Sequence, residues 1–312
     1  WTRVFRLGGP LTDNRLFDNP LLKRWVARRT ARRNGFSGYF PLYDFPLRHL
    51  HLMNHCSQDW DFRPGAFECP SLIDILQSES VWAHFFTYPM PEEEILARCR
   101  EGLCGEHTRF FFLYLTAIDA LGHAHGPAAQ AVLERLRWYD EQLRLILAEG
   151  DARGCPVDLY VFSDHGMVET EHTCGLRRQI EATGLRFGKD YVAVYDSTMA
   201  RFWRLHPSSR RVIEDCLEAE GTGRILSAEE KRRYGVDFAG DRFGETIYLL
   251  PSGTVFHPSH KSRRVLRAMH GFDPDDPRND GVFLSTCEPS RRPASITDLL
   301  GVLLDALGVA HD

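Results

Sequence analysis

The strongest constraint on the fold of this chain comes from two mainly apolar segments with one long helical pattern between them. The segments Arg109–Ile118 (RFFFLYLTAI) and Val157–Phe162 (VDLYVF) have the pattern of strands that are buried on both faces. Between them, Ala128–Glu149 carries apolar residues at helical spacing. A strand, a helix and a strand in this order predict a βαβ unit, whose strands lie parallel in one sheet.

Further segments extend this α/β pattern over the rest of the chain. Two helices are predicted at Ser71–Gln77 and Pro91–Gly102, and one strand is predicted at Val81–Tyr88. The chain closes with a predicted amphipathic helix at Ser295–Val309. We therefore expect a three-layer α/β/α sandwich with a mostly parallel sheet. Residues 186–260 mix short strand-like pieces and are predicted to form a small inserted or capping subdomain. The core would then comprise residues 1–185 and 261–312.

Charge and hydropathy exclude some classes of partner. The formal net charge of -5 argues against a nucleic-acid duplex as the partner, and no apolar run of about 18 residues predicts a transmembrane helix. One segment, residues 23–33, concentrates basic side chains. The favoured interpretation is the solvated face of a helix, and the alternative is contact with an anionic surface.

The cysteines suggest a redox state and a compartment. Eight cysteines are scattered along the 312 residues, and none stands in a CxxC pair. A chain of this length does not need disulfides to fold, so mostly reduced cysteines and a cytoplasmic location are expected.

Residues typical of metal ligands follow both predicted strands. Asp119 and His123 come after the first strand, where a tight turn at Gly122 would bring them together. The neighbours Asp164 and His165 come after the second. Taken singly, such an aspartate more often caps a helix and such a histidine more often lies on the surface. Together, at the carboxyl ends of strands in one sheet, they predict a site for a divalent metal ion.

Three segments resemble motifs of a known family. Tyr114–Pro127 (YLTAIDALGHAHGP), Val161–Met167 (VFSDHGM) and Met269–Leu284 (MHGFDPDDPRNDGVFL) resemble, in order, those of the type I phosphodiesterase/nucleotide pyrophosphatase group of the alkaline phosphatase superfamily. The closing segment ITDLLGVLLDALGV is similar to the terminal helix of that superfamily. The resemblance covers roughly residues 70–312.

The resemblance implies two divalent metal ions, with zinc preferred and manganese as the alternative. Asp119, His123 and His270 would hold one ion, and Asp164 and His165 would contribute to the other. It also implies hydrolysis of a phosphodiester or phosphomonoester in a small phosphorylated substrate, through a covalent intermediate on a Thr or Ser nucleophile.

The nucleophile and the early metal-binding aspartate of this family are not recognisable in the sequence. Thr12 and Ser37 are the visible candidates for the nucleophile. Loss of an upstream segment is the favoured explanation, and loss of the second metal site is the alternative. Two rival functions follow: a sulfatase or phosphotransferase of the same superfamily, and a non-catalytic member that binds a phosphorylated ligand or a protein partner.

Overall fold

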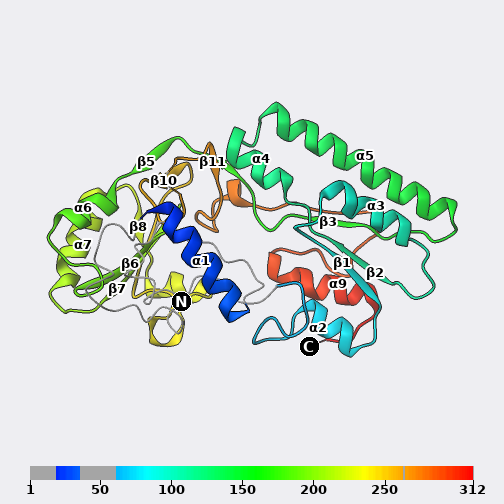
Figure 1. Ribbon diagram of the computed structural model, residues 1–312, viewed down its shortest axis with the longest axis horizontal. Coiled ribbons are helices and arrows are strands. Elements are labelled where there is room, and N and C mark those ends of the chain that lie inside the picture. The colour runs from blue at the N-terminus through cyan, green and yellow to red at the C-terminus, as the bar shows by residue number, and fades with distance from the viewer. Residues whose placement is uncertain (1–18, 36–60, 263, 312) are drawn as a thin grey trace. The chain divides into compact units, whose positions relative to one another are not determined.

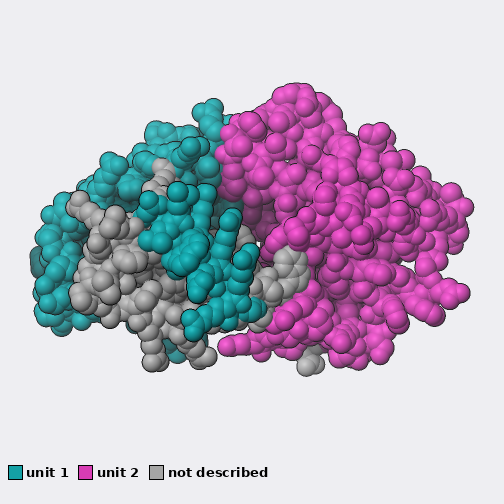
Figure 2. Space-filling view, in the orientation of Figure 1, with its two compact units in different colours: residues 1–60, 168–279 teal, residues 61–167, 280–312 magenta. Residues whose placement is uncertain are grey.

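The computed structural model describes residues 19–35, 61–262 and 264–311 of the chain (Figure 1). The chain divides into two compact units (Figure 2). Unit 1 comprises residues 1–60 and 168–279, and unit 2 comprises residues 61–167 and 280–312. Within the described ranges, no helix has the length and apolar character needed to cross a bilayer.

Unit 2 carries the first two motifs and the helices around them. Its elements are α2 (Leu72–Ser78), β1 (Ala83–Phe86), α3 (Glu92–Gly102), β2 (Phe110–Leu113), α4 (Ala117–His125), α5 (Gln130–Ala152), β3 (Tyr160–Phe162), β12 (Phe283–Ser285), a 3₁₀ turn (Ile296–Asp298) and α9 (Leu299–Leu307).

Local sequence signals explain where several of these helices begin. Ser71 caps α2 by accepting a hydrogen bond from the backbone of Asp74, whose own side chain bonds back to the cap. The three glutamates Glu92, Glu93 and Glu94 occupy the first turn of α3, where the helix dipole favours negative charge. Both helices were predicted from the sequence at nearly these bounds, and both predictions are confirmed.

The strands of unit 2 pair in two small sheets. β1 and β2 are parallel, with Ala83 opposite Phe110. β3 and β12 are antiparallel, with Tyr160 opposite Ser285. Apolar clusters on helices flank them: Leu96, Cys99, Leu103 and Ile146 join α3 to α5, and Leu76, Leu304, Leu307 and Val309 join α2 to α9.

Unit 1 is built around an antiparallel sheet. Its elements are α1 (Pro20–Asn34), β4 (Val168–Glu169), β5 (His172–Cys174), α6 (Leu176–Ala182), β6 (Tyr191–Tyr195), β7 (Met199–Arg204), α7 (Ser209–Glu220), β8 (Arg224–Ile225), α8 (Ala228–Arg233), β9 (Thr246–Leu249), β10 (Thr254–Phe256) and β11 (Ala268–Met269), with 3₁₀ turns at Ala239–Asp241 and Pro277–Asn279. The four-stranded sheet has the order β6-β7-β9-β8. Its core contains the fully buried rings of Tyr191, Tyr195, Phe202 and Tyr248.

The α/β class is confirmed, whereas the mostly parallel sandwich is not. Among the described strands only β1–β2 and β5–β10 pair in parallel, and the largest sheet is antiparallel. The run Arg109–Ile118 was predicted to be one buried strand. Its strand is limited to the half-buried residues of β2, and its last two residues already belong to α4. A short apolar run does not distinguish a strand from a helix, which explains the error. The boundaries of the inserted subdomain at residues 186 and 260 stay a prediction.

A disulfide joins Cys104 to Cys155, 51 positions apart, between the ends of α3 and α5. This pair is an exception to the expectation of mostly reduced cysteines. Free thiols are found at Cys69, Cys99, Cys174, Cys216 and Cys287, and Cys56 lies outside the described residues. The predicted cytoplasmic location stays a prediction.

Removal of this disulfide is expected to lower the free energy of unfolding by about 2–4 kcal/mol, because a long loop of the unfolded chain would no longer be closed. Urea denaturation of the Cys104→Ser/Cys155→Ser variant, followed by circular dichroism, measures the effect. Cys69→Ser removes an exposed free thiol and serves as the control. A double variant as stable as the Cys69→Ser protein would contradict the prediction.

Candidate metal centre

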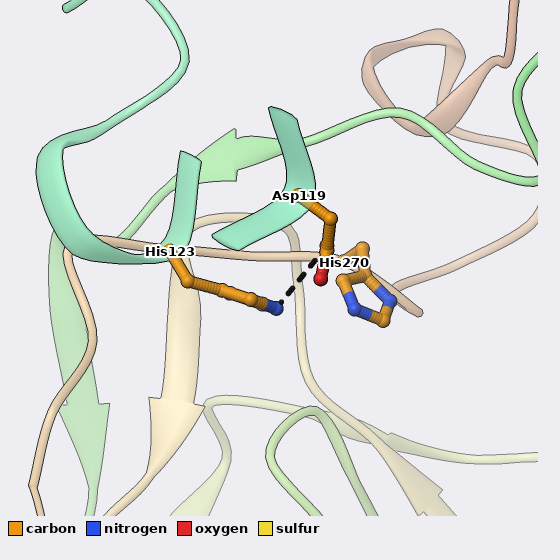
Figure 3. Close-up of side chains that lie close together, drawn as sticks. All are labelled: Asp119, His123 and His270. Carbon is orange, nitrogen blue, oxygen red and sulfur yellow. Dashed lines mark ion pairs between the residues drawn. The ribbon is translucent and has the colours of Figure 1, made fainter. Parts of the chain in front are cut away.

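Asp119 and His123 lie one turn apart on α4, and not in the tight turn that the sequence suggested. In a helix, residues four positions apart lie on the same face. Asp119 Oδ1 is 3.3 Å from His123 Nε2 (Figure 3). The helix thus presents one carboxylate and one imidazole side by side, and the helical period produces the pairing that a turn was expected to give.

Gly122 serves close packing in this motif. It is buried in α4, and a Cβ atom built there would lie 3.1 Å from Cε of Met167. Met167 ends the SDHGM segment that follows β3. The missing side chain therefore lets α4 approach that segment, so that the first two sequence motifs pack against each other within unit 2.

Asp164 and His165 form the second pair of ligand-type residues. His165 Nε2 lies 3.5 Å from Asp164 Oδ1, while His165 Nδ1 lies 2.9 Å from the carbonyl oxygen of Gly166. Because a carbonyl oxygen only accepts hydrogen bonds, this contact favours the tautomer with its proton on Nδ1. The lone pair then resides on Nε2, the nitrogen on the side of the carboxylate, as a metal ligand requires.

Tyr114 is under the electrostatic influence of both pairs and was not singled out from the sequence. It follows β2 directly. Burial, and then the negative charges of Asp164 and Asp119, raise the pKa of Tyr114 above its ordinary value. Its hydroxyl therefore keeps its proton at neutral pH and stands within the electrostatic reach of both carboxylates. Its position five residues before Asp119 was the available signal.

Glu92 holds the beginning of α4 in place. Its side chain is buried, and its carboxylate accepts hydrogen bonds from the backbone N–H of Ala117 at 2.8 Å and from the hydroxyl of Tyr139 at 2.7 Å. Arg135 approaches the same carboxylate at 3.4 Å. A cavity of about 320 Å³ lies beside this group, lined by residues that include Thr116. Glu92 was not singled out from the sequence.

Replacement of Glu92 by alanine is expected to lower the free energy of unfolding by about 1–3 kcal/mol, because the N–H of Ala117 and the hydroxyl of Tyr139 lose their acceptor. Glu93→Ala is the matched control. Glu93 lies next in the chain and also contacts Arg135 at 3.4 Å, but its side chain is 66% exposed. Urea denaturation compares the two variants, and equal losses of stability would contradict the role assigned to Glu92.

His270 belongs to unit 1 and follows β11, which pairs with β4. The next residue, Gly271, has a φ of 78°, and its carbonyl oxygen accepts a hydrogen bond from the hydroxyl of Thr198. Phe272 is buried in an apolar cluster. These neighbours fix the backbone on both sides of the imidazole. The candidate nucleophiles Thr12 and Ser37 lie outside the described residues.

Comparison with models of known protein families assigns the chain to one of them. The family model described as type I phosphodiesterase/nucleotide pyrophosphatase matches residues 43–273. The chain belongs to this family. The match includes all five ligand-type residues. The resemblance to this phosphodiesterase family, which was inferred from the sequence motifs, is therefore confirmed. Among curated protein sequences, none is significantly similar to the chain.

Solved structures show the same fold at low sequence identity. An inactive variant of murine ectonucleotide pyrophosphatase/phosphodiesterase 5 in complex with AMP has a TM-score of 0.63 and 19% identity, covering 78% of this chain and 71% of that one. The human protein has a TM-score of 0.63 and 17% identity, with the same coverage of both chains. Phosphonoacetate hydrolase from Sinorhizobium meliloti, in complex with phosphonoformate, has a TM-score of 0.51 and 16% identity. This match covers 70% of this chain and 56% of the hydrolase.

Proposed function

We propose that this chain hydrolyses phosphodiester bonds in small phosphorylated substrates with the help of two divalent metal ions. The observation that carries the proposal is that two Asp/His pairs, on α4 and after β3, lie in segments that pack against each other at Gly122 and Met167 within one unit. Membership of the phosphodiesterase family supports the reaction class. The AMP bound to the murine protein supports a small phosphorylated ligand, and the phosphonoformate bound to the bacterial hydrolase supports a ligand with a phosphonate group.

In this proposal Asp119, His123 and His270 hold one ion, and Asp164 and His165 contribute to the other. The donor set fits: carboxylate oxygens and imidazole nitrogens suit zinc, with manganese as the alternative. When bound, the ions would activate the attacking oxygen, neutralise charge on the phosphoryl group and stabilise the leaving oxygen.

The chain's own residues prepare the site for this chemistry. The contact with the carbonyl of Gly166 keeps the His165 ring oriented, and Glu92 holds the beginning of the helix that carries Asp119. Tyr114 keeps its proton, so it stays neutral beside the negative charges of the two carboxylates. A Thr or Ser nucleophile, with Thr12 and Ser37 as its candidates, completes the proposed mechanism.

Hydrolysis of two chromogenic esters tests the proposal. The chain is expected to cleave bis-p-nitrophenyl phosphate faster than p-nitrophenyl phosphate, to lose this activity in a chelator, and to regain it when zinc or manganese is added. Faster cleavage of the monoester would instead indicate a phosphatase. Bound metal without turnover of either ester would indicate a non-catalytic member that binds a phosphorylated ligand.

A further inference from the structure

The charge of α1 is opposite to that of the whole chain. This 15-residue helix contains Lys23 and several arginines but no Asp or Glu, whereas the formal net charge of the chain is -5. The helix is closed by its own caps: the Asn19 side chain accepts from the N–H of Leu21, and Gly35 ends it with a left-handed conformation. Its basic residues are therefore presented on a well-defined element.

Exposed apolar and basic side chains share one face of α1. Leu21, Trp25, Arg28 and Arg32 are spaced by four, three and four positions, which places them along one stripe of a helix. All four are exposed, with Leu21 at 73% and Trp25 at 57%. The guanidinium of Arg29 lies 5.6 Å from the centre of the Trp25 ring, beside the stripe. One end of this face is thus apolar and the other is cationic.

Stabilisation of the helix itself explains only part of this pattern. Arg32 and Arg33 lie in the last turn, where positive charge interacts favourably with the helix dipole. That effect does not extend to Arg24 and Arg28 in the earlier turns. It also gives no reason for an exposed tryptophan on the same stripe.

We propose that the stripe Leu21–Trp25–Arg28–Arg32 docks on membrane surfaces that contain anionic lipids. Arginines on a helix are attracted by anionic headgroups, and their side chains can reach the headgroups while apolar neighbours enter the interface. Tryptophan is the residue type enriched at that level of the bilayer. A nucleic acid would pair with the arginines and stack on Trp25, but it offers no apolar layer to Leu21. The helix lies along the surface in this arrangement.

Co-sedimentation with lipid vesicles tests the inference on the 312-residue chain. Binding is expected to vesicles of phosphatidylcholine with phosphatidylserine, not to phosphatidylcholine alone, and to weaken as salt is added. The Arg28→Gln/Arg32→Gln variant should bind such vesicles about thirtyfold more weakly, because it loses the attraction of two arginines to the anionic surface. Trp25→Ala should also weaken binding. Glutamine keeps the helix propensity of arginine, so the double variant is expected to fold.

The control removes two exposed arginines from another helix. Arg210 and Arg211 lie on α7, where Glu214 and Asp215 are their ion-pair partners. Arg210→Gln/Arg211→Gln should leave vesicle binding unchanged. Equal binding to both vesicle types, or an equal loss in the control, would overturn the proposal. Binding to a single-stranded oligonucleotide that the Arg28→Gln/Arg32→Gln variant weakens, without vesicle binding, would assign the helix to nucleic acid instead.

Discussion

An Asp119→Asn variant is expected to lose more than about a hundredfold in kcat/KM for bis-p-nitrophenyl phosphate, since loss of a residue that merely supports a metal ligand already costs about 10–100-fold. Asparagine keeps the shape of the side chain but removes the negative charge that would bind the ion. The Asp119 side chain is 46% exposed. Stability should therefore change little, and thermal unfolding measured beside the kinetics separates loss of function from loss of fold.

Asp140→Asn provides the matched control for this experiment. Asp140 lies on α5, is exposed, and pairs with Arg144 four positions later, much as Asp119 pairs with His123 on α4. Its replacement should leave kcat/KM unchanged. An Asp119→Asn protein as active as the Asp140→Asn protein would show that the α4 pair takes no part in the reaction.

A Gly122→Val variant is expected to lower kcat/KM by about a hundredfold, because small displacements of reacting groups have effects of this size. The added side chain would meet Met167, which lies 3.1 Å from the position of a Cβ atom at residue 122. α4 would then move away from the SDHGM segment, and Asp119 and His123 would move with it. Steady-state kinetics on the diester measures the loss.

Two further variants make the test of Gly122 specific. Ala120→Val adds the same side chain at an exposed position of the same helix and should leave activity intact. Met167→Ala, combined with Gly122→Val, restores room and should recover most of the activity. Full activity of Gly122→Val alone, or no recovery in the combined variant, would show that this packing does not position the site.

Elements with local causes were predictable from the sequence. The Ser71 cap of α2 and the acidic first turn of α3 involve residues within three positions of each other, and both helices were placed nearly at their observed bounds. The pairs Asp119–His123 and Asp164–His165 were also recognised from short spacings. The element that carries the first pair was not, because Ile118 ended an apolar run and the polar residues after it resembled a loop.

Features that depend on distant partners were not predictable. β3 pairs with β12, more than a hundred positions later, in an antiparallel register that no local pattern specifies. Glu92 bonds to Ala117 and Tyr139, which lie 25 and 47 positions away. The partner of Cys104 lies 51 positions along the chain. In each case the partner is determined by tertiary packing, and it cannot be inferred from the composition or periodicity of a single segment.

The metal content of the purified chain, measured by mass spectrometry after equilibration with zinc, tests the central claim most directly. The account predicts about two ions per chain, as in two-metal hydrolases. Asp119→Asn and Asp164→Asn should each lose about one of them, and Asp140→Asn should lose none. A chain that binds no zinc, or that binds the same amount in all three variants, would contradict the claim that these Asp/His pairs form a metal centre.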